Sequence, residues 1–117
     1  MASGIVGSIK PSAAAYKTAY KPASGTVAVV SVSVCNQASS DDTFRMGIVI
    51  SASTDPTPSI SEFVAFSSLI KASGDTTFAD RAMFGPYELN GTNNNQVVVY
   101  SGHGDTSFVI TGDEGTV

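Results

Sequence analysis

The sequence predicts an all-β fold: an antiparallel β-sandwich of about seven to eight strands, either jelly-roll-like or immunoglobulin-like. Three observations predict it. The chain has 13 valines and 7 isoleucines but only 2 leucines, and β-branched side chains favour strands over helices. Apolar and polar residues alternate along several short runs, as the two faces of a strand require. Clusters of Gly, Pro, Asn, Asp and Ser separate these runs, as turns do.

The 117-residue chain is expected to form one domain, with an N-terminal arm and first short strand over residues 1–21 and the β-sandwich over residues 22–117. Residues 1–12 are small and mildly apolar, which is typical of an arm or of an edge strand. The run AAYKTAYK alternates weakly and predicts a short strand over residues 14–21. The following segment KPASG predicts a turn.

The strongest strand pattern lies between residues 26 and 53, where two alternating runs flank the polar break QASSDD. Each run has one apolar face, and the two faces consist of Val30, Val32, Val34, Phe44, Met46, Ile48 and Ile50. The opposite face of the first run carries Ser31, Ser33 and Cys35. Two such runs joined by a turn predict an antiparallel hairpin whose apolar face needs cover.

Three further regions complete the predicted sheets. Residues 60–71 fit either a helix or a bent strand, and we favour the strand because the surrounding pattern is β-rich. Residues 76–84 predict a short strand that ends at Gly85-Pro86. Beyond a polar loop, residues 96–101 and 106–111 predict a last hairpin.

Composition and charge exclude some classes of function. Charged residues make up only 14% of the chain, so hydroxyl and amide groups form most of the expected polar surface, which suits packing against copies of itself or a larger assembly. The net charge of −4 argues against binding to nucleic acid. Charge is uneven, because residues 1–40 contain three lysines and no acid, whereas residues 72–117 contain six acids and one arginine. No apolar run is long enough to predict a membrane span, and no signal peptide is expected.

Few residues suggest catalysis or metal binding. The only histidine, His103, has Asp105 as its one nearby candidate partner, whereas metal sites combine several ligands. Asp41 and Asp42 have oxygens that calcium accepts, but the spacing of a calcium loop is absent, and a turn role is favoured. The nucleophile motif G-x-S-x-G is also absent, and Cys35 is expected to pack rather than react. We therefore expect no enzyme activity, no cofactor and no metal.

Carbohydrate binding is the main alternative among ligand-binding functions. Sugars stack on exposed aromatic rings, and the chain offers four tyrosines: Tyr16, Tyr20, Tyr87 and Tyr100. Two polar loops are candidates to complete such a site, through Asn93, Asn94, Asn95, His103 and Asp105.

Short motifs along most of the chain follow a recognisable order. They are Tyr20-Lys21-Pro22-Ala23, the valine-rich run Val27–Val34, Cys35-Asn36, the break Ser39–Asp42, Thr43-Phe44-Arg45 and the closing run Ser107–Gly112. In this order they resemble small structural proteins of tailed bacteriophages, especially those of marine cyanobacteria. The segment 60–90 carries the resemblance least. The resemblance implies a non-enzymatic β-sandwich located in the virion, where it decorates the capsid or builds the tail, neck or fibre.

The resemblance also implies partners. We expect other virion structural proteins and self-association in a closed ring, with a trimer favoured. The expected docking element is the small, basic N-terminal arm, through Ile5, Val6, Ile9, Lys10, Lys17 and Lys21. In the carbohydrate alternative, the chain is a binding module at a fibre tip that attaches to the host.

Overall fold

The computed structural model describes residues 2–74 and 80–116, and over these residues the chain forms eight strands and one short 3-10 helix, η1. The elements in chain order are β1 (Ser3–Ile9), β2 (Lys17–Tyr20), β3 (Thr26–Asn36), β4 (Asp42–Ile50), β5 (Phe63–Ile70), β6 (Arg81–Asn90), η1 (Gly91–Asn93), β7 (Asn95–Ser101) and β8 (Thr106–Thr116). The prediction of an all-β chain with seven to eight strands is confirmed.

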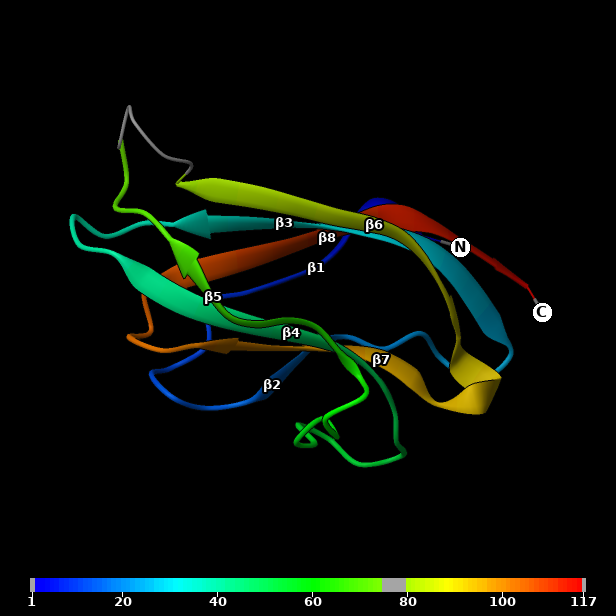
Figure 1. The fold of residues 1–117 in the computed structure, drawn as a ribbon. Coiled ribbons are helices and arrows are strands. Elements are labelled where there is room, and N and C mark those ends of the chain that lie inside the picture. Colours follow the sequence, from blue (N-terminus) through cyan, green and yellow to red (C-terminus); the bar gives the residue numbers. More distant parts are fainter. Residues whose placement is uncertain (1, 75–79, 117) are drawn as a thin grey trace.

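The strands form two antiparallel sheets that lie one above the other (Figure 1). The strand order in the first sheet is β1-β8-β3-β6, and in the second sheet it is β2-β7-β4-β5. Only β4 and β5 follow one another within one sheet. Every other pair of consecutive strands is divided between the two sheets.

The pairing of the strands defines the topology. β1 pairs with β8, β2 with β7, β3 with β6 and β4 with β5, as if one long hairpin had been rolled into a sandwich. The roll is completed where β3 meets β8 and β4 meets β7. Eight antiparallel strands in this arrangement form a jelly roll, and the immunoglobulin-like alternative, with its different strand order, does not apply.

Both predicted hairpins are wrong, although their strands are right. β3 and β4 lie in different sheets, and so do β7 and β8. Alternation predicts that each strand has one apolar face, but it does not say whether the next strand lies beside that face or across the core from it. The loops 37–41 and 102–105 are short enough for a hairpin, yet here they cross from one sheet to the other.

The core lies between the two sheets and contains the predicted valine face of β3. Within it, the centroid of the Phe44 ring lies 5.9 Å from that of Phe84 and 6.1 Å from that of Phe108, both in edge-on geometry. The predicted apolar face of β4 is only partly buried in the core. Phe44 and Met46 are buried, but Ile48 is partly buried and Ile50 is 70% exposed. Val49 is buried instead, on the outer side of the second sheet.

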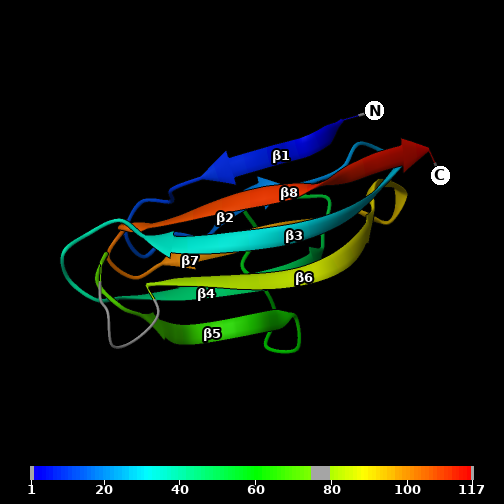
Figure 2. The same ribbon diagram turned by 90° about the horizontal axis from the view of Figure 1, so that it is seen from above.

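The segment 51–62 explains why Val49 is buried on the outer side, because it covers part of that side of the second sheet below β4 (Figure 1). A Cβ atom on Gly47 would lie 3.1 Å from the Pro58 side chain, so glycine allows the segment to approach β4 closely. The second sheet is therefore covered in part on its outer side. The first sheet is not: no described segment crosses its outer face (Figure 2).

The predicted strand over residues 60–71 is confirmed as β5. The strand predicted to end at Gly85-Pro86 instead continues as β6 to Asn90, and its predicted start at 76–79 lies outside the described residues. β6 passes Gly85-Pro86 through a register shift opposite Ser31. Gly85 has a φ of 113°, and a Cβ there would lie 2.9 Å from the Val30 carbonyl oxygen. Proline is tolerated because β6 is an edge strand.

Residues 3–20 are part of both sheets and do not form a separate arm. β1 is an edge strand of the first sheet and β2 an edge strand of the second. Of the two structures expected for residues 1–12, the edge strand is therefore the one observed. The division at residue 21 does not separate two bodies, because β1 pairs with β8 and β2 with β7.

Candidate functional site

The apolar residues of the expected docking element do not share one surface. Ile5 faces outward from the first sheet opposite Thr111 and is 70% exposed. Val6 and Ile9 pack against the core. Pairing of β1 with β8 explains this arrangement, because a strand in a sandwich turns alternate side chains inward. Only Ile5 of the three is free to contact a partner.

The lysines of that element are divided between the two sheets. Lys17 Nζ lies 3.6 Å from Asp55 Oδ2, and Lys21 Nζ donates a 3.4 Å hydrogen bond to the Ala52 carbonyl oxygen. Both therefore hold β2 to the segment 51–62. A hydrogen bond from the Thr18 N–H, and then the charge of Lys17, lower the pKa of the Asp55 carboxyl. Lys10 is exposed beside the first sheet.

The two polar loops proposed for sugar binding lie at opposite ends of β7 (Figure 1). Asn93, Asn94 and Asn95 precede the strand or begin it, whereas His103 and Asp105 follow it. Seven residues of strand span roughly 20 Å, so the loops do not form one site. The asparagines also have structural roles: Asn94 ends η1 in left-handed geometry, and Asn95 Oδ1 accepts a 2.9 Å hydrogen bond from the Asn90 N–H.

The loop that contains His103 is held by a buried carboxylate. Asp42 is 1% exposed, and its Oδ2 accepts hydrogen bonds of 2.5 Å from Ser101 Oγ and 2.6 Å from Thr106 Oγ1. Its Oδ1 accepts bonds of 2.8 Å from the backbone N–H groups of Thr43 and His103. Burial raises the pKa of Asp42, but the four hydrogen bonds together lower it below the ordinary value. The carboxylate thus has a structural role at the β7–β8 crossing.

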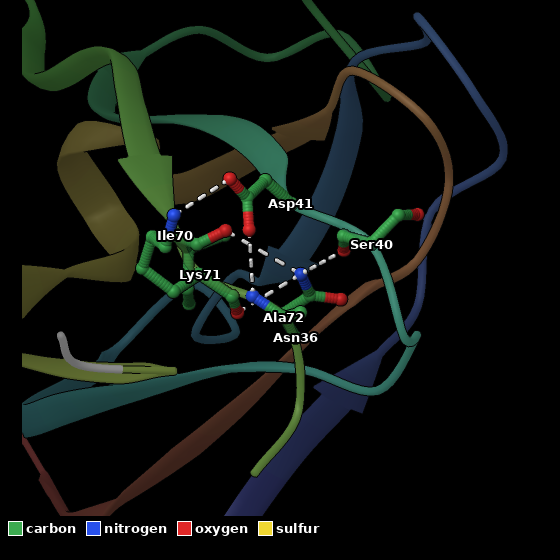
Figure 3. A network of polar contacts seen from close by, with 6 residues as sticks. All are labelled: Asn36, Ser40, Asp41, Ile70, Lys71 and Ala72. Atoms are coloured by element: carbon green, nitrogen blue, oxygen red, sulfur yellow. Dashed lines mark hydrogen bonds and ion pairs between the residues drawn. The ribbon is translucent and has the colours of Figure 1, made fainter. Parts of the chain in front are cut away.

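A second polar network holds the β3–β4 crossing at the same end of the sandwich (Figure 3). Asn36 is fully buried, and its Nδ2 donates to the carbonyl oxygens of Ser40, Ile70 and Lys71 at 2.8, 3.4 and 3.1 Å. Asp41 Oδ2 lies 2.9 Å from Lys71 Nζ, and its Oδ1 accepts from the Ala72 N–H. The loops at this end are therefore fixed, and the carboxylates of Asp41 and Asp42 bond to the protein itself.

An aromatic cluster around Arg45 forms the first candidate surface. It lies on the outer side of the second sheet and consists of Arg45, Tyr16, Tyr100, Phe63 and Phe66, which we call the Arg45 cluster. The guanidinium carbon lies 4.2 Å from the centroid of the Phe66 ring and 4.7 Å from that of Tyr100. Arg45 also donates to Tyr16 Oη at 2.8 Å and to Ser67 Oγ at 3.0 Å. Phe66 remains 58% exposed.

This cluster contains two of the four tyrosines that were expected to stack on sugars. The ring centroids of Tyr16 and Tyr100 are 4.8 Å apart. Tyr20 is 8% exposed and donates to Glu114 Oε2, and Tyr87 packs against the core. Sequence alternation gave no sign of the cluster, because Arg45 and Phe66 meet only where β4 and β5 pair around a register shift.

The outer face of the first sheet forms the second candidate surface, which we call the open face (Figure 2). Four rows of side chains that cross the strands are each named after their β3 residue, and a fifth row, Val27 with Asn90 and Gly115, lies beyond the Val29 row. The Val29 row is Glu88, Val29, Asp113 and Ser3; the Ser31 row is Ser31, Thr111 and Ile5; the Ser33 row is Met83, Ser33, Val109 and Ser8; the Cys35 row is Arg81, Cys35 and Ser107. The middle rows carry hydroxyl and apolar side chains and no charge, so this face fits contact with another sheet.

Charge on the open face is confined to its two ends. Glu88 and Asp113 lie on either side of Val29 and are exposed. At the opposite end the Arg81 side chain is 83% exposed, although Asp80 Oδ1 lies 3.9 Å from its Nε. The exposed Lys10 lies at that end as well, where it lines a hollow with Ser8 and Ser107.

Two shallow hollows lie in the basic half of the open face. One lies between β3 and β6, and its lining includes Ser33, Cys35, Arg81 and Met83. The other lies between β1 and β8, with Ser8, Lys10, Ser107 and Val109 among its lining residues. The sequence predicts the serine face of β3. It does not predict the residues beside that face, because β6 and β8, which supply them, lie far from β3 in the chain.

Comparisons with family models, with curated proteins and with solved structures find no match to this chain. Within residues 2–74 and 80–116 no three His, Cys, Asp or Glu side chains are grouped so that they could hold a metal ion. The same part of the chain contains no helix with the length and apolar character needed to cross a membrane.

Proposed function

We propose that this chain is a non-enzymatic structural subunit of a tailed-phage virion, which acts by packing against copies of itself and against other virion proteins. The open face is the observation that carries the proposal. A four-stranded sheet face that no described segment covers, rich in hydroxyl groups and poor in charge, is suited to burial against another protein. Viral capsid proteins are among the proteins that use jelly rolls, an analogy at the level of the fold alone.

Three of the exposed large apolar residues support the same function. Ile5, Val29 and Met83 are 70%, 48% and 74% exposed, and all three are on the open face. Exposed apolar side chains that share one face indicate a contact surface more strongly than scattered ones do. A structural subunit needs such a surface and needs no catalytic group.

Electron microscopy of intact particles tests this proposal. Particles from a lysate that contains this chain are labelled with a gold-conjugated antibody raised against it. We expect label at regular positions on the capsid, neck, tail or fibre, and the chain itself in the purified particles by mass spectrometry. Its absence from purified particles would overturn the proposal.

The second candidate function is carbohydrate binding, and the Arg45 cluster is the observation that favours it. Partly exposed rings beside a cation form a surface on which sugars stack. The faces of Phe66 and Tyr100 that Arg45 covers are already occupied, which is why this function ranks second. Binding of the purified protein to a glycan array, lost in a Phe66→Ala variant that still folds, would establish it.

A further inference from the structure

We propose that the open face binds a second copy of this chain through its own open face, across a twofold axis. The axis lies in the plane of contact, perpendicular to the strands, and passes over Val32 between the Ser31 and Ser33 rows. The inference deepens the proposed function, because it names the first partner of the subunit. Three features of the face carry it: its charges, its shape and its size.

Charge determines the direction of the pairing. The acidic row contains Glu88 and Asp113, and the opposite end contains Arg81 and Lys10. An axis perpendicular to the strands places the acidic end of each copy on the basic end of the other. Glu88 then faces Arg81 of the second copy along β6, and this contact occurs twice. An axis parallel to the strands would place acid on acid, which is unfavourable.

The same operation matches the exposed apolar side chains with the hollows. Val29 of one copy lies over Cys35 of the other, where the hollow between β3 and β6 opens. Ile5 lies over Ser8, which lines the hollow between β1 and β8. Met83 meets the register shift of β6 at Gly85, a residue that has no side chain. The charges alone select the axis. The fit of the apolar side chains at that axis is a second, independent observation that supports the same pairing.

The size of the face is sufficient for a dimer. Four strands about 4.8 Å apart and roughly 30 Å long present on the order of 600 Å² per copy. Two copies then bury about 1,200 Å², the lower limit for a specific interface. Serine and threonine make up most of the middle rows, which allows two sheets to approach to about 10 Å, the usual spacing of packed sheets. A contact of this type is isologous and closes as a dimer, so it differs from the trimer that the sequence favoured.

Reversal of charge with rescue tests the pairing. The variants Arg81→Glu, Glu88→Arg and the double variant Arg81→Glu/Glu88→Arg are compared with the wild-type chain by sedimentation velocity at low salt. Lys21→Glu, a reversal on the other sheet, is the control. Circular dichroism establishes that each variant is folded.

We expect a dimer that each single reversal weakens at least about tenfold, because attraction becomes repulsion at two symmetric positions. The double variant restores affinity to within about threefold of wild type, and the control changes it by less than that. A wild-type monomer, a trimer, or single reversals without effect would overturn the pairing. A double variant as weak as either single variant would overturn it also. The proposed function is judged separately, because a chain that is monomeric in solution but present on particles would contradict only the pairing.

Discussion

Ser101 Oγ donates a 2.5 Å hydrogen bond to Asp42 Oδ2, although 59 residues separate the two in the chain. Ser101 is the last residue of β7, and its Oγ also accepts from the N–H groups of Gly104 and Thr106. Thr106 Oγ1 in turn donates to the same carboxylate. Asp42, Ser101 and Thr106 thus connect the start of β4, the end of β7 and the start of β8, and so join the two sheets at one end of the sandwich.

Replacement of Asp42 by asparagine is expected to destabilise the fold. An amide keeps one acceptor oxygen, but its NH₂ group then faces two hydroxyls that donate in the wild type. A buried network that is only partly satisfied costs about 1–3 kcal/mol. Urea unfolding measures the difference. Asp105→Asn is the matched control, because its carboxylate accepts none of these bonds, and an equal loss in both variants would contradict the role of Asp42.

The contribution of Asp42 is also expected to depend on pH. The pKa of this carboxyl is lower in the folded chain than its ordinary value of 3.8, so the unfolded state binds the proton more readily. Its stabilising effect is therefore present above pH 3.8 and is lost as the pH falls through the folded-state value. The stability difference between wild type and Asp42→Asn should shrink on acidification below that pH. A difference that stays constant down to the acid transition would contradict this.

Two glycines of β8 provide a sharp test of close packing. A Cβ atom on Gly112 would lie 2.1 Å from the Val29 carbonyl oxygen, whereas one on Gly115 would find its nearest neighbour at 3.9 Å. We expect Gly112→Ala to cost about 3 kcal/mol or more, because backbone must move, and Gly115→Ala to be neutral or slightly stabilising. Thermal unfolding of the two variants compares them directly. Similar stability of both would show that β8 adapts more freely than the structure indicates.

The sequence contains enough information to predict the strands and one side of the core, but not the partners of the strands. Val30, Val32 and Val34 alternate as a buried face must, and they are buried. The same alternation occurs in a hairpin and in a crossing between sheets, so it does not distinguish the predicted hairpin from the observed crossing of β3 and β4. The buried hydrogen bonds of Asn36 and Asp42 distinguish the two cases. Their partners include Ile70, which is 34 positions from Asn36, and Ser101, which is 59 positions from Asp42.

The candidate surfaces were less predictable for the same reason. The serine face of β3 could be read from Ser31 and Ser33, but the charged ends of the open face come from β6 and β8. The sequence predicts that Lys17 and Lys21 belong to a docking arm. They bond to the segment 51–62 instead, a contact between positions about 30 or more residues apart that no local pattern encodes.

The hydroxyl of Tyr20 is expected to titrate at unusually high pH. Burial, then the hydrogen bond to Glu114 and the negative charge of Glu114, raise the pKa of the Tyr20 hydroxyl well above its ordinary value of 10.0. The stability that this contact provides is complete below pH 10.0 and is lost as the pH rises beyond it. Absorbance titration should show a late tyrosinate step well above pH 10.0. Tyr20→Phe should remove that late step, and its persistence in this variant would assign it to another residue.

The final prediction concerns Arg45, whose guanidinium group lies between two rings and bonds to two hydroxyls. Lysine retains the charge at this position but not the planar group that contacts Phe66 and Tyr100 together, at 4.2 and 4.7 Å. Arg45→Lys is therefore expected to lower the free energy of unfolding by about 1–2 kcal/mol. The other arginine of the chain provides the control: Arg81 is 83% exposed, so Arg81→Lys should change stability by less than about 0.5 kcal/mol. Denaturant unfolding of both variants measures this contrast, and equal effects would mean that the Arg45 cluster contributes no more to the fold than an exposed side chain does.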